Sequence, residues 1–125
     1  MWRKYNENPC GKSIGDCAVR AVSVALGLGW YESFDLLCME ARRQCNMPSA
    51  DAVWGAVLLK NGFTRSVIPN NYPNCYTAAD FCRDHPRGVY VLTFGGHVAC
   101  IIDGFLYDSW DSSNETPIFY FRRNF

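Results

Sequence analysis

The spacing of apolar residues changes at about position 62, and this change most constrains the fold. Before it, apolar side chains recur every three or four residues, which is typical of amphipathic helices. After it, short runs rich in Val, Ile, Tyr and Phe alternate with turn residues, which is typical of strands. The sequence therefore predicts an α+β fold, with N-terminal helices packed on a C-terminal antiparallel sheet. At 125 residues, the chain is expected to form a single domain over 1–125.

Three helices are expected in the first half of the chain. They cover 17–28, then 31–45, then a stretch that begins after Ser49 as N-cap and is closed by Asn61-Gly62. The glycines after the first helix are expected to cap its C-terminus. The apolar face of the second helix is expected to comprise Phe34, Leu37, Cys38, Ala41 and Cys45. That of the third is expected to comprise Ala52, Val53, Ala56, Val57 and Leu59.

Five strands and one short helix are expected in the second half. The strands cover 63–68, 89–94, 97–102, 105–108 and 118–121, and Thr77 is expected to cap a helix that runs through Arg83. Asp103-Gly104 is a two-residue hairpin signal, which predicts that 102 pairs with 105. That register brings His97 and Asp108 to the same end of the hairpin.

Charge and hydropathy argue against two classes of partner, namely nucleic acids and membranes. Lys plus Arg equals Asp plus Glu at 12 each, and no basic block occurs, so we expect no nucleic-acid partner. The opening residues lack the apolar core of a signal peptide, and no apolar run is long enough to span a bilayer. We therefore expect a cytoplasmic protein without a membrane partner.

The seven cysteines do not predict a disulfide framework, because their number is odd and nothing marks the chain for export. Two pairs seven residues apart, Cys38 with Cys45 and Cys75 with Cys82, are expected to pack within helices. No Cys-x-x-Cys pair occurs, so neither zinc nor another cofactor is expected. A poorer alternative is a metal site made of Cys10, Cys17 and His97.

Cys17 follows Gly15-Asp16 at the point where a loop is expected to become a helix. The positive end of a helix dipole favours the thiolate, although the neighbouring Asp16 carboxylate should oppose it. Cys17, His97 and Asp108 stand in the chain order of a nucleophilic triad, with Asp111 as an alternative for its third member.

Three short motifs resemble known cysteine peptidases. Gly95-Gly96-His97-Val98-Ala99 is similar to the Gly-His-Ala/Val strand start of the papain-like superfamily, and Tyr107-Asp108-Ser109-Trp110 is similar to its Asn-Ser-Trp. The stretch Gly-Asp-Cys-Ala-Val-Arg-Ala at 15–21 also resembles the cysteine motif of OTU-type deubiquitinases. The resemblance implies a papain-like core in which Cys17 is the nucleophile, His97 the base, Asp108 the orienting residue and Trp110 an aromatic shield.

The resemblance also implies an activity, namely hydrolysis of an amide, peptide or isopeptide bond in a peptide or protein substrate through a thioester. An acceptor other than water would make the protein an acyltransferase. Papain-like enzymes carry a Gln six residues before the cysteine, where this chain has Gly11. Asn8 is our candidate oxyanion donor beside the Cys17 backbone N–H, with Asn6 and Ser13 as alternatives. A non-catalytic binding or inhibitor protein, of the kind that bacteriophage encode, is the competing hypothesis.

Overall fold

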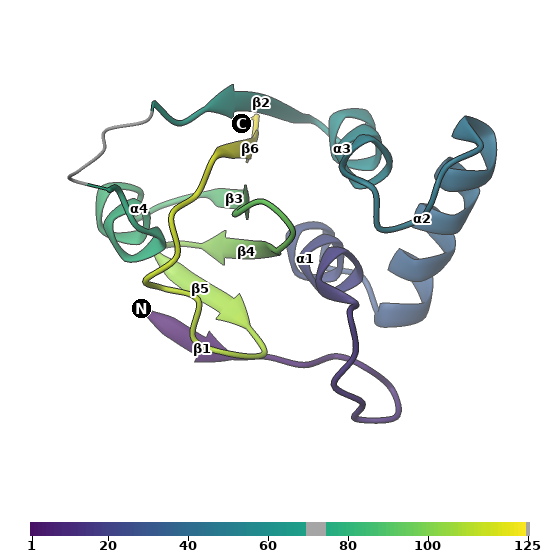
Figure 1. Cartoon of the computed structure of the whole chain (residues 1–125), viewed down its shortest axis with the longest axis horizontal. Coiled ribbons are helices and arrows are strands. Elements are labelled where there is room, and N and C mark those ends of the chain that lie inside the picture. Colours follow the sequence, from purple (N-terminus) through teal and green to yellow (C-terminus); the bar gives the residue numbers. More distant parts are fainter. Residues whose placement is uncertain (70–74, 125) are drawn as a thin grey trace.

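The computed structural model describes residues 1–69 and 75–124 and shows a mixed α+β fold, as the sequence predicts (Figure 1). In the described residues the helices are α1 (Cys17–Leu26), α2 (Trp30–Gln44), α3 (Asp51–Lys60) and α4 (Ala78–Asp84). The strands are β1 (Trp2–Lys4), β2 (Phe63–Val67), β3 (Val89–Thr93), β4 (Val98–Ile102), β5 (Phe105–Asp108) and β6 (Phe119–Arg123). They form one sheet in the order β1-β5-β4-β3-β6-β2.

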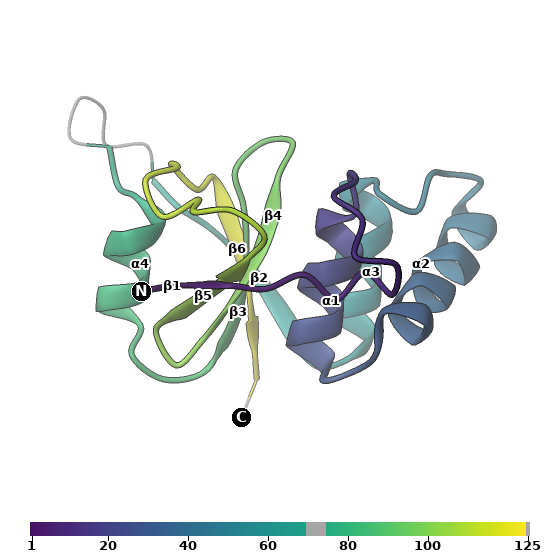
Figure 2. The same cartoon turned by 90° about the horizontal axis from the view of Figure 1, so that it is seen from below.

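The sheet is covered on both faces (Figure 2). Helices α1 to α3 lie on one face, where Val91, Val98 and Cys100 of the sheet pack against Val22 and Leu37. Helix α4 lies on the other face, where its buried side chains meet Leu92, Ile101 and Leu106. This alternation along β3 and β4 follows from the period of two in a strand, and it explains why both strands read as continuous apolar runs.

The hairpin of β4 and β5 has the predicted register. Ile102 pairs with Phe105 and Cys100 with Tyr107. Asp103 and Gly104 both have positive φ, 50° and 80°, as a tight turn of this hand requires. The Asp103 side chain also accepts a hydrogen bond from the Gly88 N–H at 2.9 Å, which ties the turn to the start of β3.

Strand β1 was not predicted, and it makes the sheet mixed rather than wholly antiparallel. Three residues carry too little periodicity to identify a strand. The strand forms because it pairs in parallel with the edge of β5, with Lys4 opposite Asp108. Beyond it, the Tyr5 N–H donates to the Asp108 carbonyl at 2.8 Å. The chain start therefore supports the strand end that carries Asp108.

Three details of the predicted helices are wrong. The N-cap of α3 is Ala50 rather than Ser49, because the Ala50 carbonyl accepts the first helical hydrogen bonds from Val53 and Trp54. Trp54 packs against Phe119 and Phe121 and fixes the rotation of this helix. As a result Leu58 is buried, whereas Leu59 and Ala52 are exposed.

On α2 the expected apolar face is only half right. Leu37 and Ala41 are buried, but Phe34 is exposed and stacks on Trp30 with ring centroids 5.0 Å apart. The exposed Cys45 is the C-cap in a left-handed conformation. The expected packing also fails for Cys75, which is exposed and precedes α4, while Cys82 is buried. Across residues 1–69 and 75–124, no helix is long and apolar enough to cross a membrane.

Candidate active site

Cys17 is the first residue of α1, the helix packed on the centre of the sheet (Figure 1). Asp16 is the N-cap residue, but its side chain makes no cap hydrogen bond. Both carboxylate oxygens are engaged elsewhere, one by the Arg20 guanidinium and the other by the Trp30 indole N–H at 2.9 Å. The cap residue therefore leaves the first N–H groups of α1, beside the thiol, without a side-chain acceptor.

His97 is placed by the turn that joins β3 to β4. Gly95 and Gly96 both have positive φ, 75° and 99°, which L side chains rarely adopt. The turn is closed by a hydrogen bond from the Phe94 N–H to the His97 carbonyl at 2.8 Å. The glycine pair therefore places the imidazole at the end of β4 nearest the N-terminus of α1.

The structure brings His97 and Asp108 together, as the hairpin register predicts. His97 Nε2 lies 2.6 Å from Asp108 Oδ2. The same oxygen accepts the Ser112 hydroxyl at 2.6 Å, and Oδ1 accepts the Ser109 N–H at 2.8 Å. These bonds hold the carboxylate plane, so the ring is held at Nε2 and Nδ1 is left for the thiol.

The Cys17 thiol lies close enough to the His97 imidazole and to the Val98 backbone for both to affect its pKa. Burial by itself raises the pKa of Cys17, but the interactions with these two groups and the nearby charges of His97 and Arg20 bring it below its ordinary value. Burial likewise lowers the pKa of His97, but its hydrogen bond with Asp108 and its interaction with Cys17 outweigh this effect and raise it to about 9. Both shifts favour a thiolate–imidazolium pair.

Arg20 is a buried member of the site that the sequence analysis did not single out. Its Nη1 pairs with Asp16 and its Nη2 lies 3.6 Å from Asp108 Oδ1. The spacing i, i+4 between Asp16 and Arg20 is a signal that could have identified this pair. Asp16 was expected to oppose the thiolate, and the structure shows its charge paired with Arg20. Ser112 was also missed, because nothing in the loop pattern distinguishes it from its neighbour Ser113.

Asn8 organises the loop that leads to Cys17. Its side-chain oxygen accepts hydrogen bonds from the N–H groups of Cys10 at 2.9 Å and Lys12 at 3.2 Å. Asn6 lies behind it, with its own oxygen accepting the Asn8 N–H at 3.1 Å. These hydrogen bonds of Asn8 are local to the loop, and its oxyanion role stays a prediction.

Of the other candidates, Asp111 and Cys10 lie outside the cluster, whereas Trp110 contacts it. Asp111 is exposed and accepts both hydrogen bonds from Ser113, so the carboxylate on His97 belongs to Asp108. Trp110 covers the imidazole with ring centroids 4.9 Å apart and is 44% exposed. Cys10 is exposed, and within the described residues no group of three His, Cys, Asp or Glu side chains could hold a metal ion.

An apolar cavity of about 230 Å³ lies at the N-terminal end of α1, and its wall includes Asp16 and Ala18, the chain neighbours of Cys17, but not Cys17 itself. Trp30 and Phe34 of α2 form another side, and Ile14 and Pro48 complete it. Asp16 contributes little negative charge to this wall, because both its oxygens are already bonded within the protein.

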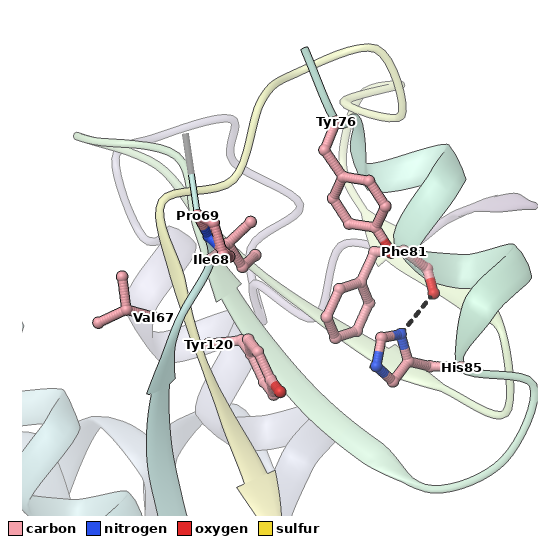
Figure 3. Close-up of a pocket in the computed structure, with 7 residues that line it drawn as sticks. All are labelled: Val67, Ile68, Pro69, Tyr76, Phe81, His85 and Tyr120. Carbon is pink, nitrogen blue, oxygen red and sulfur yellow. Dashed lines mark hydrogen bonds between the residues drawn. The ribbon is translucent and has the colours of Figure 1, made fainter. Parts of the chain in front are cut away.

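A second cavity lies on the α4 side of the sheet, away from Cys17 (Figure 3). It holds the other histidine of the chain, His85, whose ring stacks on Phe81 with centroids 3.8 Å apart. The His85 Nδ1 lies 2.9 Å from the Phe81 carbonyl oxygen. His85 thus has a backbone partner where His97 has a carboxylate and a thiol, so only the site at His97 is arranged as a triad.

No protein-family model, curated protein or solved structure matches this chain.

Proposed function

We propose that this protein is a cysteine hydrolase with a papain-like core, which cleaves an amide, peptide or isopeptide bond through a thioester. One observation carries the proposal: a thiol at a helix N-terminus lies beside an imidazole whose Nε2 is held by a buried carboxylate. The order helix, then antiparallel strands bearing His97 and Asp108, agrees with the papain-like motifs in the sequence.

The chemistry follows from the protonation states. His97 holds the proton of Cys17, and the thiolate attacks the substrate carbonyl carbon to form a C–S bond. The imidazolium then gives its proton to the leaving nitrogen as the C–N bond breaks. Water attacks the thioester, His97 takes up its proton, and the acid is released as the thiol is restored. Asp108 keeps the ring oriented throughout and stabilises its positive charge.

The oxyanion formed in each attack needs donors near the sulfur. The Cys17 N–H lies at the start of α1, where the helix dipole favours negative charge and Asp16 makes no cap bond. We assign a second donor to the Asn8 carboxamide, which the loop bonds hold in a fixed orientation.

The apolar cavity at the N-terminal end of α1 is our candidate pocket for a substrate side chain. Its aromatic and aliphatic walls favour an apolar side chain over a charged one.

Intact-mass analysis after exposure to electrophilic probes tests the proposal. We expect peptide vinyl sulfones with an apolar residue next to the warhead, or ubiquitin-type warheads, to add once, at Cys17. Cys17→Ser should abolish labelling, and His97→Ala should slow it by two orders of magnitude or more, which is the usual range for a catalytic base.

The exposed Cys10, Cys45 and Cys75 are internal controls for this experiment. Equal labelling of these thiols and Cys17 would contradict an activated nucleophile. Full biological effect in Cys17→Ser would instead support the binding or inhibitor hypothesis. Release of an amine with transfer of the acyl group to a second amine, rather than to water, would identify an acyltransferase.

A further inference from the structure

We propose that Arg20 is a positioning residue of this site, which holds Asp108 against His97 and so keeps the imidazole in place for Cys17. This inference rests on the proposed function, because it assigns a role within the same reaction. Arg20 touches neither the sulfur nor the ring in the contacts described above, and it acts through Asp108.

The guanidinium lies between two buried carboxylates. Arg20 is 7% exposed, Asp16 5% and Asp108 2%, so water does little to screen the three charges. One terminal nitrogen is directed at Asp16 and the other at Asp108. A planar fork with fixed spacing can contact both carboxylates at once, whereas the single ammonium of a lysine cannot match both positions.

The far side of Asp16 connects this pair to α2. The Trp30 indole donates to the Asp16 oxygen that Arg20 does not use. A continuous chain of contacts therefore runs from α2 through Asp16 and Arg20 to Asp108, and its last member is the 3.6 Å ion pair. Together with the Ser109 N–H, the guanidinium holds Oδ1 of Asp108 on the side away from His97, while Oδ2 meets His97 Nε2.

The charges also act on the ring. Asp108 lies against both the guanidinium and the imidazole, so its carboxylate stabilises a positive charge on the ring. Without the guanidinium, Asp108 would keep the hydrogen bonds from Ser109 and Ser112 but would lose the positive charge that faces Oδ1.

A competing account is that Arg20 only neutralises the charge of Asp16. A variant with a neutral residue at position 16 distinguishes this account from ours. In Asp16→Asn the carboxamide oxygen still accepts from Trp30, but no charge at position 16 needs a partner. We expect Arg20→Met in this background to lower the alkylation rate of Cys17 by iodoacetamide at pH 6.5 about tenfold or more. Arg83→Met, the same change on the exposed side of α4, should leave the rate unchanged.

Arg20 also acts on the thiol directly through its charge, so the test is completed by a double-mutant cycle with Asp108→Asn. If Arg20 acts through Asp108, Arg20→Met should have at most a threefold effect once Asp108 is Asn. The proposal would be overturned if Arg20→Met slowed alkylation as much with Asp108→Asn as without it. It would also be overturned if Arg20→Met had no effect on the rate in the Asp16→Asn protein. Should Arg20→Met lose its cooperative thermal transition, the cycle is run with Arg20→Lys, which keeps the charge and loses the fork.

The failure of this inference is distinguishable from that of the proposed function. If Cys17 of the wild-type protein is alkylated only near pH 8.5, about the pKa of an ordinary thiol, then Cys17 is not an activated nucleophile and the proposed function is wrong. If the wild-type thiol is activated and the cycle shows no coupling, only the role of Arg20 is wrong.

Discussion

Cys17 and His97 perturb each other in opposite directions. The pKa of the thiol is lowered and that of the imidazole is raised to about 9, so the charged pair exists in the window between them. Since the two groups interact strongly, the two limbs of any pH profile belong to the pair rather than to either residue.

This window predicts the pH dependence of the reaction. Labelling of Cys17 by a peptide vinyl sulfone should rise with pH through the lowered thiol pKa, because the thiolate is the attacking form. It should decline above about 9, where the imidazolium loses the proton that the attacked group needs. Stopped-time mass spectrometry from pH 4 to 10 measures both limbs.

The variant His97→Ala serves as the control for this profile. Its lower limb should move up to about 8.5, the pKa of an unperturbed cysteine, and its upper limb should disappear. An identical profile in the two proteins would show that the ring does not activate the thiol.

The N-cap residues of α1 and α4 both have side chains that can accept a capping hydrogen bond, but only the N-cap of α4 makes one. In α4, Thr77 accepts the Asp80 N–H at 3.2 Å while the Asp80 carboxylate accepts the Thr77 N–H at 3.0 Å, which is a full capping box. In α1, the Asp16 carboxylate is directed to Arg20 and Trp30 instead. Helix α1 therefore lacks a side-chain cap beside the thiol, whereas α4, on the other face of the sheet, has one.

Thr77→Ala should therefore lower the free energy of unfolding by about 1 kcal/mol, the usual cost of losing a cap. Urea denaturation followed by circular dichroism measures this change. Thr116→Ala, at an exposed loop position, should change stability by no more than about 0.5 kcal/mol. Because α4 lies on the opposite face of the sheet, neither variant should alter the rate at which Cys17 is alkylated, and a slower rate in Thr77→Ala would contradict the separation of the two faces.

Sequence could predict the elements whose signals are local. The Thr77 cap, the Asp103-Gly104 turn and the pairing it sets were all correct, and that pairing placed His97 near Asp108. Details that depend on tertiary packing were not predictable in this way. The rotation of α3 is set by the fit of Trp54 against β6, and β1 exists only because β5 offers an edge.

The residues of the candidate site likewise divide into those that local sequence could predict and those that depend on tertiary packing. The residue types and chain order indicated Cys17, His97 and Asp108, and the structure places them together. The double use of Arg20 requires knowing that α1 and the end of β5 are adjacent, which no local pattern reveals. The choice of Asp108 over Asp111 likewise depended on the strand end, since the two are only three residues apart.

Burial across the whole molecule predicts how its seven thiols differ. Burial raises the pKa of both Cys82 and Cys100, on opposite faces of the sheet. In the native protein these two should resist a brief treatment with iodoacetamide at pH 7, while Cys17 reacts first and the exposed thiols follow. Peptide mapping by mass spectrometry gives the order, and in guanidinium chloride all seven should react at similar rates. Early modification of Cys100 in native buffer would contradict the packing of β4 against α1.

The sulfur lies near the start of the chain, whereas the ring and carboxylate that act on it come from the last quarter. In a nascent or partly unfolded chain all seven thiols should therefore have ordinary reactivity. The pKa of Cys17 is lowered only after the residues around His97 and Asp108 have packed against α1. Rapid capture of Cys17 at neutral pH would consequently count the fully assembled molecules in a preparation, without any substrate being known.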